Sequence, residues 1–271
     1  KKKIVVLLIV EVKYPMFLRL MKYNTAMFSI SAILGIILSI TLVLVTSFTT
    51  SIYYPIEMWI HSQDFLTVIY PLFCTIPFCW EILSERKNNF LTSVVSRVSL
   101  RKYLVYRYIG GLLAVSIVIF LFSFSGAVFA EYIVTPMHPS IHPSKIGLNL
   151  WGGVLVNTPL QYALLLSLWR IFLADLYFTF GFILALFCKN TFIALTGPFI
   201  YSILENYIMS ILGVPSYSIS TAFFISRLAP GTTTVTDLLV GPCVLIATCI
   251  VILLSNIVPS MLRNTRCLDI V

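Results

Sequence analysis

The chain has 271 residues, of which 59% are hydrophobic and only 10% are charged. A soluble domain usually carries about 25% charged residues, so this composition excludes a soluble globular protein. The net charge of +8 does not indicate nucleic-acid binding, because the basic residues lie between long apolar stretches, where the orientation of a membrane protein accounts for them.

Residues 1–24 form a basic N-terminal segment that contains six Lys and Arg residues. Between Met16 and Tyr23, apolar side chains alternate irregularly with Arg19 and Lys22. This pattern is typical of an amphipathic helix that lies in the membrane interface. A basic tail without regular structure is the alternative interpretation.

Residues 25–271 are expected to form one all-α domain, a polytopic membrane protein with six transmembrane helices. Crossing roughly 30 Å of hydrocarbon needs about 20 apolar residues in a helix, and a helix satisfies its own backbone hydrogen bonds there. Long runs without charged residues meet this requirement, although Pro71 and Pro77 interrupt the second one. The six spans are expected at residues 26–47, 65–84, 108–130, 167–187, 191–212 and 238–258.

The distribution of basic residues predicts the orientation in the membrane. Fifteen of the 18 Lys and Arg residues lie in segments on one side, including the N-terminal segment and the connection 85–107, and two lie on the other side. Basic loops stay in the cytoplasm, so both termini of this multi-pass cell-membrane protein are expected inside. The outer loops are then residues 48–64, 131–160 and 213–237. In the first of these, Tyr53, Tyr54 and Trp59 are interpreted as an interfacial aromatic belt.

The sequence contains no catalytic signature. A phosphate-binding loop of the form Gly-x-x-x-x-Gly-Lys-Ser/Thr is missing, as is His-Glu-x-x-His, so we predict no catalytic residue, no metal site and no cofactor bound by this chain. His138 and His142 are each followed by proline, which disfavours the helix that would align them on a metal. A rigid exposed loop is favoured there. The six cysteines include no Cys-x-x-Cys pair, so neither a disulfide framework nor a zinc site is indicated.

Three ionisable residues lie inside the predicted spans, namely Arg170, Asp175 and Glu205. Charges within a membrane are costly and are usually paired or functional. Because the three lie at overlapping depths, we expect Arg170 to pair with Asp175 or Glu205.

The fifth predicted span has a polar face. Ser202, Asn206 and Ser210 are four residues apart, so they share one side of a helix. This face is interpreted either as part of a translocation path or as a packing surface of small and polar side chains.

The connection between the second and third spans is the most informative segment. At about 100° per residue, its apolar residues cover an arc of roughly 140°, and polar residues fill the remainder. The pattern predicts a short cytoplasmic amphipathic helix, and the apolar residues are Phe90, Leu91, Val94, Val95 and Val98. A helix that lies passively on the lipid surface is the alternative.

This connection resembles the cytoplasmic coupling segment of type-2 ABC exporter permeases. The resemblance is carried by Glu85-Arg86, Leu91, Ser96-Arg97 and Tyr103-Leu104, and by the short turn Phe187-Cys188-Lys189-Asn190 between the fourth and fifth spans. The family often has glycine shortly after the Glu-Arg pair and proline before the Ser-Arg pair, where this chain has Asn89 and Val95.

The resemblance implies the permease subunit of an exporter that moves an amphipathic or hydrophobic substrate (a peptide, lipid or drug) outward. A second permease subunit, identical or paralogous, would pair with it, and separate cytoplasmic ATPase subunits would bind ATP and Mg²⁺. Phe90, Leu91, Val94 and Val95 would then fill a groove on the ATPase, and Glu85, Arg86 and Arg97 would orient the contact.

The alternative is a polytopic membrane protein without an ATPase partner, such as an ion-coupled carrier, a receptor or an assembly factor. An ion-coupled carrier is expected to contain two matching repeats, and the sequence shows none. A membrane enzyme is the third interpretation.

Overall fold

The structure of the protein, a computed structural model, describes residues 25–66, 69–88, 99–142, 150–188, 190–224 and 234–262. Their regular elements are helices, together with one isolated bridge between Ile52 and Pro139. The helices are α2 (Thr25–Thr49), α3 (Pro55–Asp64), α4 (Tyr70–Lys87), α6 (Leu100–Tyr132), α7 (Gly152–Asn157), α8 (Pro159–Phe187), α9 (Thr191–Ile211), the 3₁₀ helix η2 (Pro215–Tyr217), α10 (Ile219–Phe223) and α11 (Val235–Leu262).

Local sequence explains where several helices begin. Proline occupies one of the first two positions of α3, α4 and α8, where its missing N–H would have no helical partner and its fixed φ suits a helix. The side chain of Asn190 accepts a hydrogen bond from the backbone nitrogen of Phe192 at 2.9 Å and so caps α9.

Five helices of the described residues are long and apolar enough to cross a membrane, namely α2, α6, α8, α9 and α11. The all-helical class expected from the sequence is therefore confirmed, and the five helices are compatible with the expected multi-pass membrane protein. Helix α4 coincides with the second expected span, but its last two turns carry Glu81, Glu85, Arg86 and Lys87. It is not among the five, so the count of six spans stays a prediction.

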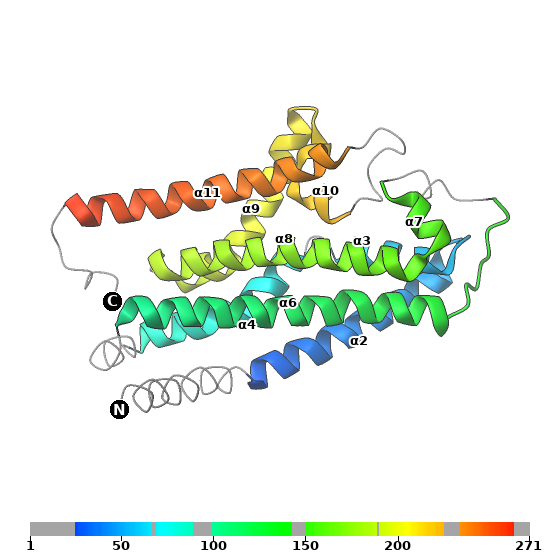
Figure 1. The fold of residues 1–271 in the computed structure, drawn as a ribbon, viewed down its shortest axis with the longest axis horizontal. Coiled ribbons are helices and arrows are strands. Elements are labelled where there is room, and N and C mark those ends of the chain that lie inside the picture. The colour runs from blue at the N-terminus through cyan, green and yellow to red at the C-terminus, as the bar shows by residue number, and fades with distance from the viewer. Residues whose placement is uncertain are drawn as a thin grey trace, which may run out of the picture.

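The long helices form a bundle in which α6 and α8 lie side by side along the long axis (Figure 1). Helix α2 packs on α6, and α4 packs on α8 and α9. One end of the bundle, here called the junction end, holds the last turn of α4 and the first turn of α6, whereas α3 and α7 lie toward the opposite end. Helices α9, α10 and α11 meet about midway between them.

Close helix contacts depend on small residues, as is usual in membrane bundles. At Gly126 of α6, an added Cβ would lie 2.1 Å from Ser39 Oγ of α2 and 3.1 Å from the Trp59 ring of α3. Glycine is therefore what allows these three helices to approach one another.

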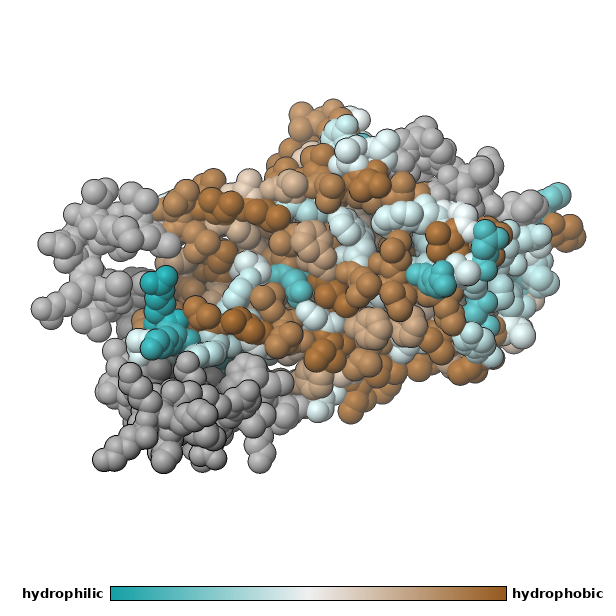
Figure 2. Space-filling model, viewed as in Figure 1, coloured by the Kyte–Doolittle hydropathy of each residue, from teal (hydrophilic) through white to brown (hydrophobic). Residues whose placement is uncertain are grey.

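The visible surface matches a protein embedded in lipid. Hydrophobic residues cover most of the middle of the face in Figure 2, and hydrophilic residues gather toward the two ends of the long axis. Only part of the most apolar stretch of each candidate span is buried inside the chain. The buried share is 28% for α2, α9 and α11. Because exposed apolar surface of this extent is rare in soluble monomers, lipid or another membrane-embedded partner is expected to cover it.

The expected outer loops contain helices that the sequence analysis missed. Helix α3 lies within residues 48–64, α7 within 131–160, and η2 and α10 within 213–237. The interfacial interpretation of Trp59 is wrong, because its side chain is 0% exposed and packs inside the bundle against α6. Tyr53, in contrast, is 42% exposed.

Two expected elements lie outside the described residues: the interfacial helix of residues 1–24 and the central part of the coupling helix, residues 89–98. The orientation in the membrane also stays a prediction.

The orientation predicts which surface cysteines react from outside the cell. In a variant without native cysteines, Ile141→Cys is expected to react with a membrane-impermeant maleimide on intact cells, because Ile141 is 91% exposed in the predicted outer loop. Lys102→Cys, also exposed but at the junction end, is expected to react only after the cells are permeabilised. Labelling of Lys102→Cys on intact cells would reverse the orientation.

Candidate functional site

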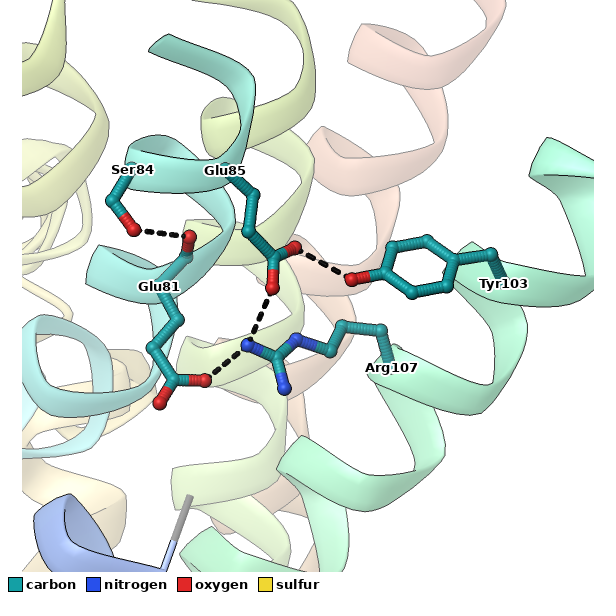
Figure 3. A network of polar contacts seen from close by, with 5 residues as sticks. All are labelled: Glu81, Ser84, Glu85, Tyr103 and Arg107. Atoms are coloured by element: carbon teal, nitrogen blue, oxygen red, sulfur yellow. Dashed lines mark hydrogen bonds and ion pairs between the residues drawn. The ribbon is translucent and has the colours of Figure 1, made fainter. Parts of the chain in front are cut away.

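Among the described residues, the ion pairs that join two helices lie at the junction end, between α4 and α6. Glu81 and Glu85 are four residues apart on α4, and Tyr103 and Arg107 are four residues apart on α6. Residues with this spacing lie on one face of a helix, so each helix presents a pair of polar groups to the other (Figure 3). We call these four residues the junction cluster.

Arg107 is the centre of the junction cluster. Its Nη2 donates to Glu85 Oε1 at 3.0 Å and also forms an ion pair with Glu81. The hydroxyl of Tyr103 donates to the other carboxylate oxygen of Glu85 at 2.8 Å. The Arg107 side chain is only 4% exposed, and the two glutamates are 12% and 15% exposed. Buried charges of this kind persist only when they are paired and hydrogen-bonded.

Arg86 extends this network to a third helix. Its Nη1 donates to the carbonyl oxygens of Ala185 at 3.1 Å and Cys188 at 2.8 Å. These carbonyls belong to the last turn of α8 and to the residue that follows it, where helical partners are missing. A positive charge there is also favoured by the helix dipole. The end of α4 is thus fastened to both α6 and α8.

The junction cluster brackets the segment that the sequence predicts to be a coupling helix. Glu85 and Arg86 precede residues 89–98, and Tyr103 and Arg107 follow them. The structure engages Glu85 and Arg86 in contacts within this chain. The other predicted coupling residues, Phe90, Leu91, Val94, Val95 and Arg97, lie outside the described residues.

Sequence reasoning missed Glu81, Tyr103 and Arg107 as members of the site. The sequence did contain a signal for these residues. Two acids four residues apart lie near the end of one helix, and a tyrosine and an arginine four residues apart lie near the start of the next. Two helices joined by a short connection place such pairs at the same end of a bundle, so the complementary spacing itself indicated the contact.

The three intramembrane charges do not form the expected cluster. Arg170 donates from Nη1 to Ser123 Oγ at 3.0 Å, and its guanidinium carbon lies 4.7 Å from the centroid of the Trp59 ring. Asp175 accepts from Ser116 Oγ at 3.0 Å. The prediction that Arg170 pairs with Asp175 or Glu205 is wrong, since no such ion pair occurs among the described residues.

Glu205 instead holds the short helix α10. One of its carboxylate oxygens accepts from Ser218 Oγ at 3.1 Å, and the other accepts from the backbone nitrogen of Ile219 at 3.1 Å. The carboxylate is buried and satisfies the first turn of α10, so it is fully used in anchoring that turn.

The predicted polar face of the fifth span divides into two environments. Ser202 is buried, and its Oγ lies 3.2 Å from Ser220 Oγ near α10. Asn206 and Ser210 are exposed on α9, where Ser210 Oγ donates to the backbone oxygen of Asn206 at 2.8 Å. Within one chain, the three residues therefore do not line a common path.

The histidine pair lies on an exposed loop. Backbone oxygens of both residues accept hydrogen bonds, His138 from the nitrogen of Ile52 at 3.0 Å and His142 from Ser140 Oγ at 3.0 Å. In the part of the chain that the structure describes, no group of three His, Cys, Asp or Glu side chains is placed to hold a metal ion.

No protein-family model, no curated protein and no solved structure matches this chain.

Proposed function

We propose that the chain is the membrane permease subunit of an ATP-driven exporter. Separate cytoplasmic subunits would bind ATP and Mg²⁺ and would dock on the segment between α4 and α6. The observation that carries the proposal is the junction cluster, because it joins the end of α4 to the start of α6, the two helices between which this segment lies.

The proposal gives the junction cluster a mechanical role. A partner that moves residues 89–98 acts on the end of α4 and the start of α6 together, because the Arg107–Glu85 contact joins them. Arg86 carries the same displacement to the end of α8. A flexible attachment would dissipate the motion locally, whereas coupling over a distance needs contiguous rigid contacts.

The apolar surfaces of the bundle suit the rest of the proposal. Helices α2, α9 and α11 expose large hydrophobic side chains, which lipid and a second permease subunit would cover. An amphipathic or hydrophobic substrate (a peptide, lipid or drug) would then move along a path completed by that second subunit, with Asn206 and Ser210 on the exposed side of α9 available to it.

The test is a charge placed on the apolar arc of the coupling segment. The double substitution Val94→Asp and Val95→Asp is expected to release the ATPase and abolish substrate-stimulated ATP hydrolysis in proteoliposomes, because an apolar face that enters a groove cannot carry two charges. The matched control is Thr92→Asp with Ser93→Asp, which adds the same charge to the polar arc and is expected to retain both properties.

Two results would contradict the proposal. If the Val94/Val95 variant co-purifies with an ATPase as well as the wild type does, this segment is not the docking element. If the wild-type protein, purified from its native membrane, carries no phosphate-loop ATPase in stoichiometric amount, a membrane protein without an ATPase partner is the correct class.

A further inference from the structure

The short helix α10 returns into the bundle and is held there by specific contacts. Glu205 binds its first turn through Ser218 and Ile219. At its other end, Trp169 Nε1 of α8 donates to the carbonyl oxygen of Ala222 at 2.8 Å. A helix of five residues has no stability of its own, so these contacts determine where α10 lies.

Helix α11 fits closely against the start of α10. A Cβ added to Gly241 would lie 2.5 Å from the backbone nitrogen of Ile219 and 2.7 Å from its Cα. Contacts this short with backbone atoms cannot be relieved by rotating a side chain. Any larger residue at position 241 must therefore displace α10 or α11.

The aromatic residues at the end of α10 cover a buried polar region. The Phe223 ring centroid lies 4.7 Å from that of Tyr70 on α4 and 5.8 Å from that of Tyr177 on α8. The Phe224 ring lies 5.9 Å from the guanidinium carbon of Arg170. Phe223 and Phe224 are 1% and 3% exposed, so they are inserted into the bundle.

Several buried polar groups of α3, α4 and α8 have no hydrogen-bond partner among the described residues. They are both amide atoms of Gln63, the hydroxyl of Tyr70 and Nε of Arg170. These three residues are 1%, 3% and 1% exposed, respectively. Gln63 is four residues after Trp59 on α3, so it lies on the side of α3 on which Trp59 meets Arg170. Tyr70 packs against Phe223, and the next residue, Phe224, lies over Arg170.

Buried polar groups in proteins are nearly always satisfied, by protein atoms or by ordered water. The unpartnered groups here include donors (Arg170 Nε and Gln63 Nε2), an acceptor (Gln63 Oε1) and a hydroxyl that can do both. Water both donates and accepts, whereas an anion only accepts.

We propose that Gln63, Tyr70 and Arg170 line an internal site that holds water, and that α10 is the plug that closes this site. The inference does not depend on an ATPase partner. It can therefore fail while the proposed function stands, and the proposed function can fail while the inference stands.

A native cysteine reports on the plug. Cys74 is four residues after Tyr70 on α4, on the same side of the helix, and is 0% exposed. In protein whose other five cysteines are replaced by alanine, the rate at which a charged methanethiosulfonate reagent modifies Cys74 measures the access of water to this region. Intact-protein mass spectrometry follows the reaction.

Two substitutions are expected to open the plug. Gly241→Ala forces α10 away from α11, and Trp169→Phe removes the donor to Ala222 while keeping a ring. Each is expected to raise the modification rate of Cys74. For Trp169→Phe the increase is expected to be about tenfold, the change that the loss of one hydrogen bond produces in an opening equilibrium. The matched control is Gly110→Ala, since an added Cβ there meets nothing within 4 Å; its rate is expected to equal that of the parent protein.

The measurement decides in either direction. A faster modification of Cys74 in Gly241→Ala or Trp169→Phe, without a faster modification in Gly110→Ala, supports the proposal that α10 is the plug. The proposal is wrong if neither variant reacts faster than the parent while both remain folded by thermal melting. It is also wrong if Cys74 of the parent protein already reacts as fast as it does in detergent-unfolded protein, because the site would then be open.

Discussion

Replacing Arg107 with alanine is expected to destabilise the protein by on the order of 3 kcal/mol, because the substitution leaves two largely buried carboxylates without their countercharge. Glu81 and Glu85 both bind this guanidinium group, and Tyr103 alone cannot neutralise them. The free energy of unfolding, measured by denaturant titration of the purified protein in mixed micelles, checks the size of the effect. Under the proposed function, substrate-stimulated ATP hydrolysis is lost as well.

Arg101→Ala is the matched control for this prediction. Arg101 lies on the same helix six residues earlier, and its side chain is exposed, so its loss is expected to change stability by less than about 0.5 kcal/mol. A triple variant, Arg107→Met with Glu81→Gln and Glu85→Gln, removes all three charges together and is expected to recover part of the loss. Equal stability of the Arg107→Ala and Arg101→Ala proteins would show that the junction cluster carries no net interaction.

The long helices were predictable because hydrocarbon imposes a length. A span of about 20 apolar residues has few alternatives, and the expected span 108–130 lies within α6, just as the expected span 167–187 lies within α8. Helix α6 extends beyond its expected start because about two turns with charged residues, from Leu100 to Arg107, continue the helix outside the apolar run. Hydropathy alone cannot locate that end.

The partners of the buried charges depended on rotation about the helix axis. Arg170 and Asp175 are five residues apart on α8, and at about 100° per residue they point roughly 140° away from each other. Overlapping depth therefore did not bring them together. Both side chains reach α6, but at different positions along it: Arg170 contacts Ser123, and Asp175 contacts Ser116, seven residues earlier.

The same geometry divides the polar face of α9. Residues four apart drift by about 40° at each step, so Ser202 points inward while Ser210 reaches the exposed side. The partner of Glu205 was not predictable for a different reason. It is α10, a five-residue helix inside a segment expected to be an outer loop, and no periodicity can be read from so short an element.

Trp59 shows what an aromatic residue in a predicted loop can do inside a bundle. Its ring is 0% exposed, its Nε1 donates to the carbonyl oxygen of Ser123 at 2.8 Å, and one face supports the guanidinium group of Arg170. Trp59→Ala is expected to destabilise the protein by about 3–5 kcal/mol, the usual cost of removing a buried tryptophan. Part of the loss is the cation–π contact, which contributes about 2 kcal/mol where water is excluded. Thermal and denaturant unfolding of the purified protein measure the change.

Trp80→Ala is the matched control, since it deletes the same side chain from α4, where Trp80 is 47% exposed. Its effect is expected to stay below about 1 kcal/mol, because little packing is lost on a face covered by lipid or detergent. Trp59→Phe separates the contributions further: it keeps a ring beneath Arg170 and removes the donor to Ser123, so it is expected to cost about 1 kcal/mol for the lost hydrogen bond, in addition to the smaller ring. If Trp59→Ala is no more destabilising than Trp80→Ala, then α3 does not pack into the bundle, and the internal site around Arg170 loses the helix that positions Gln63.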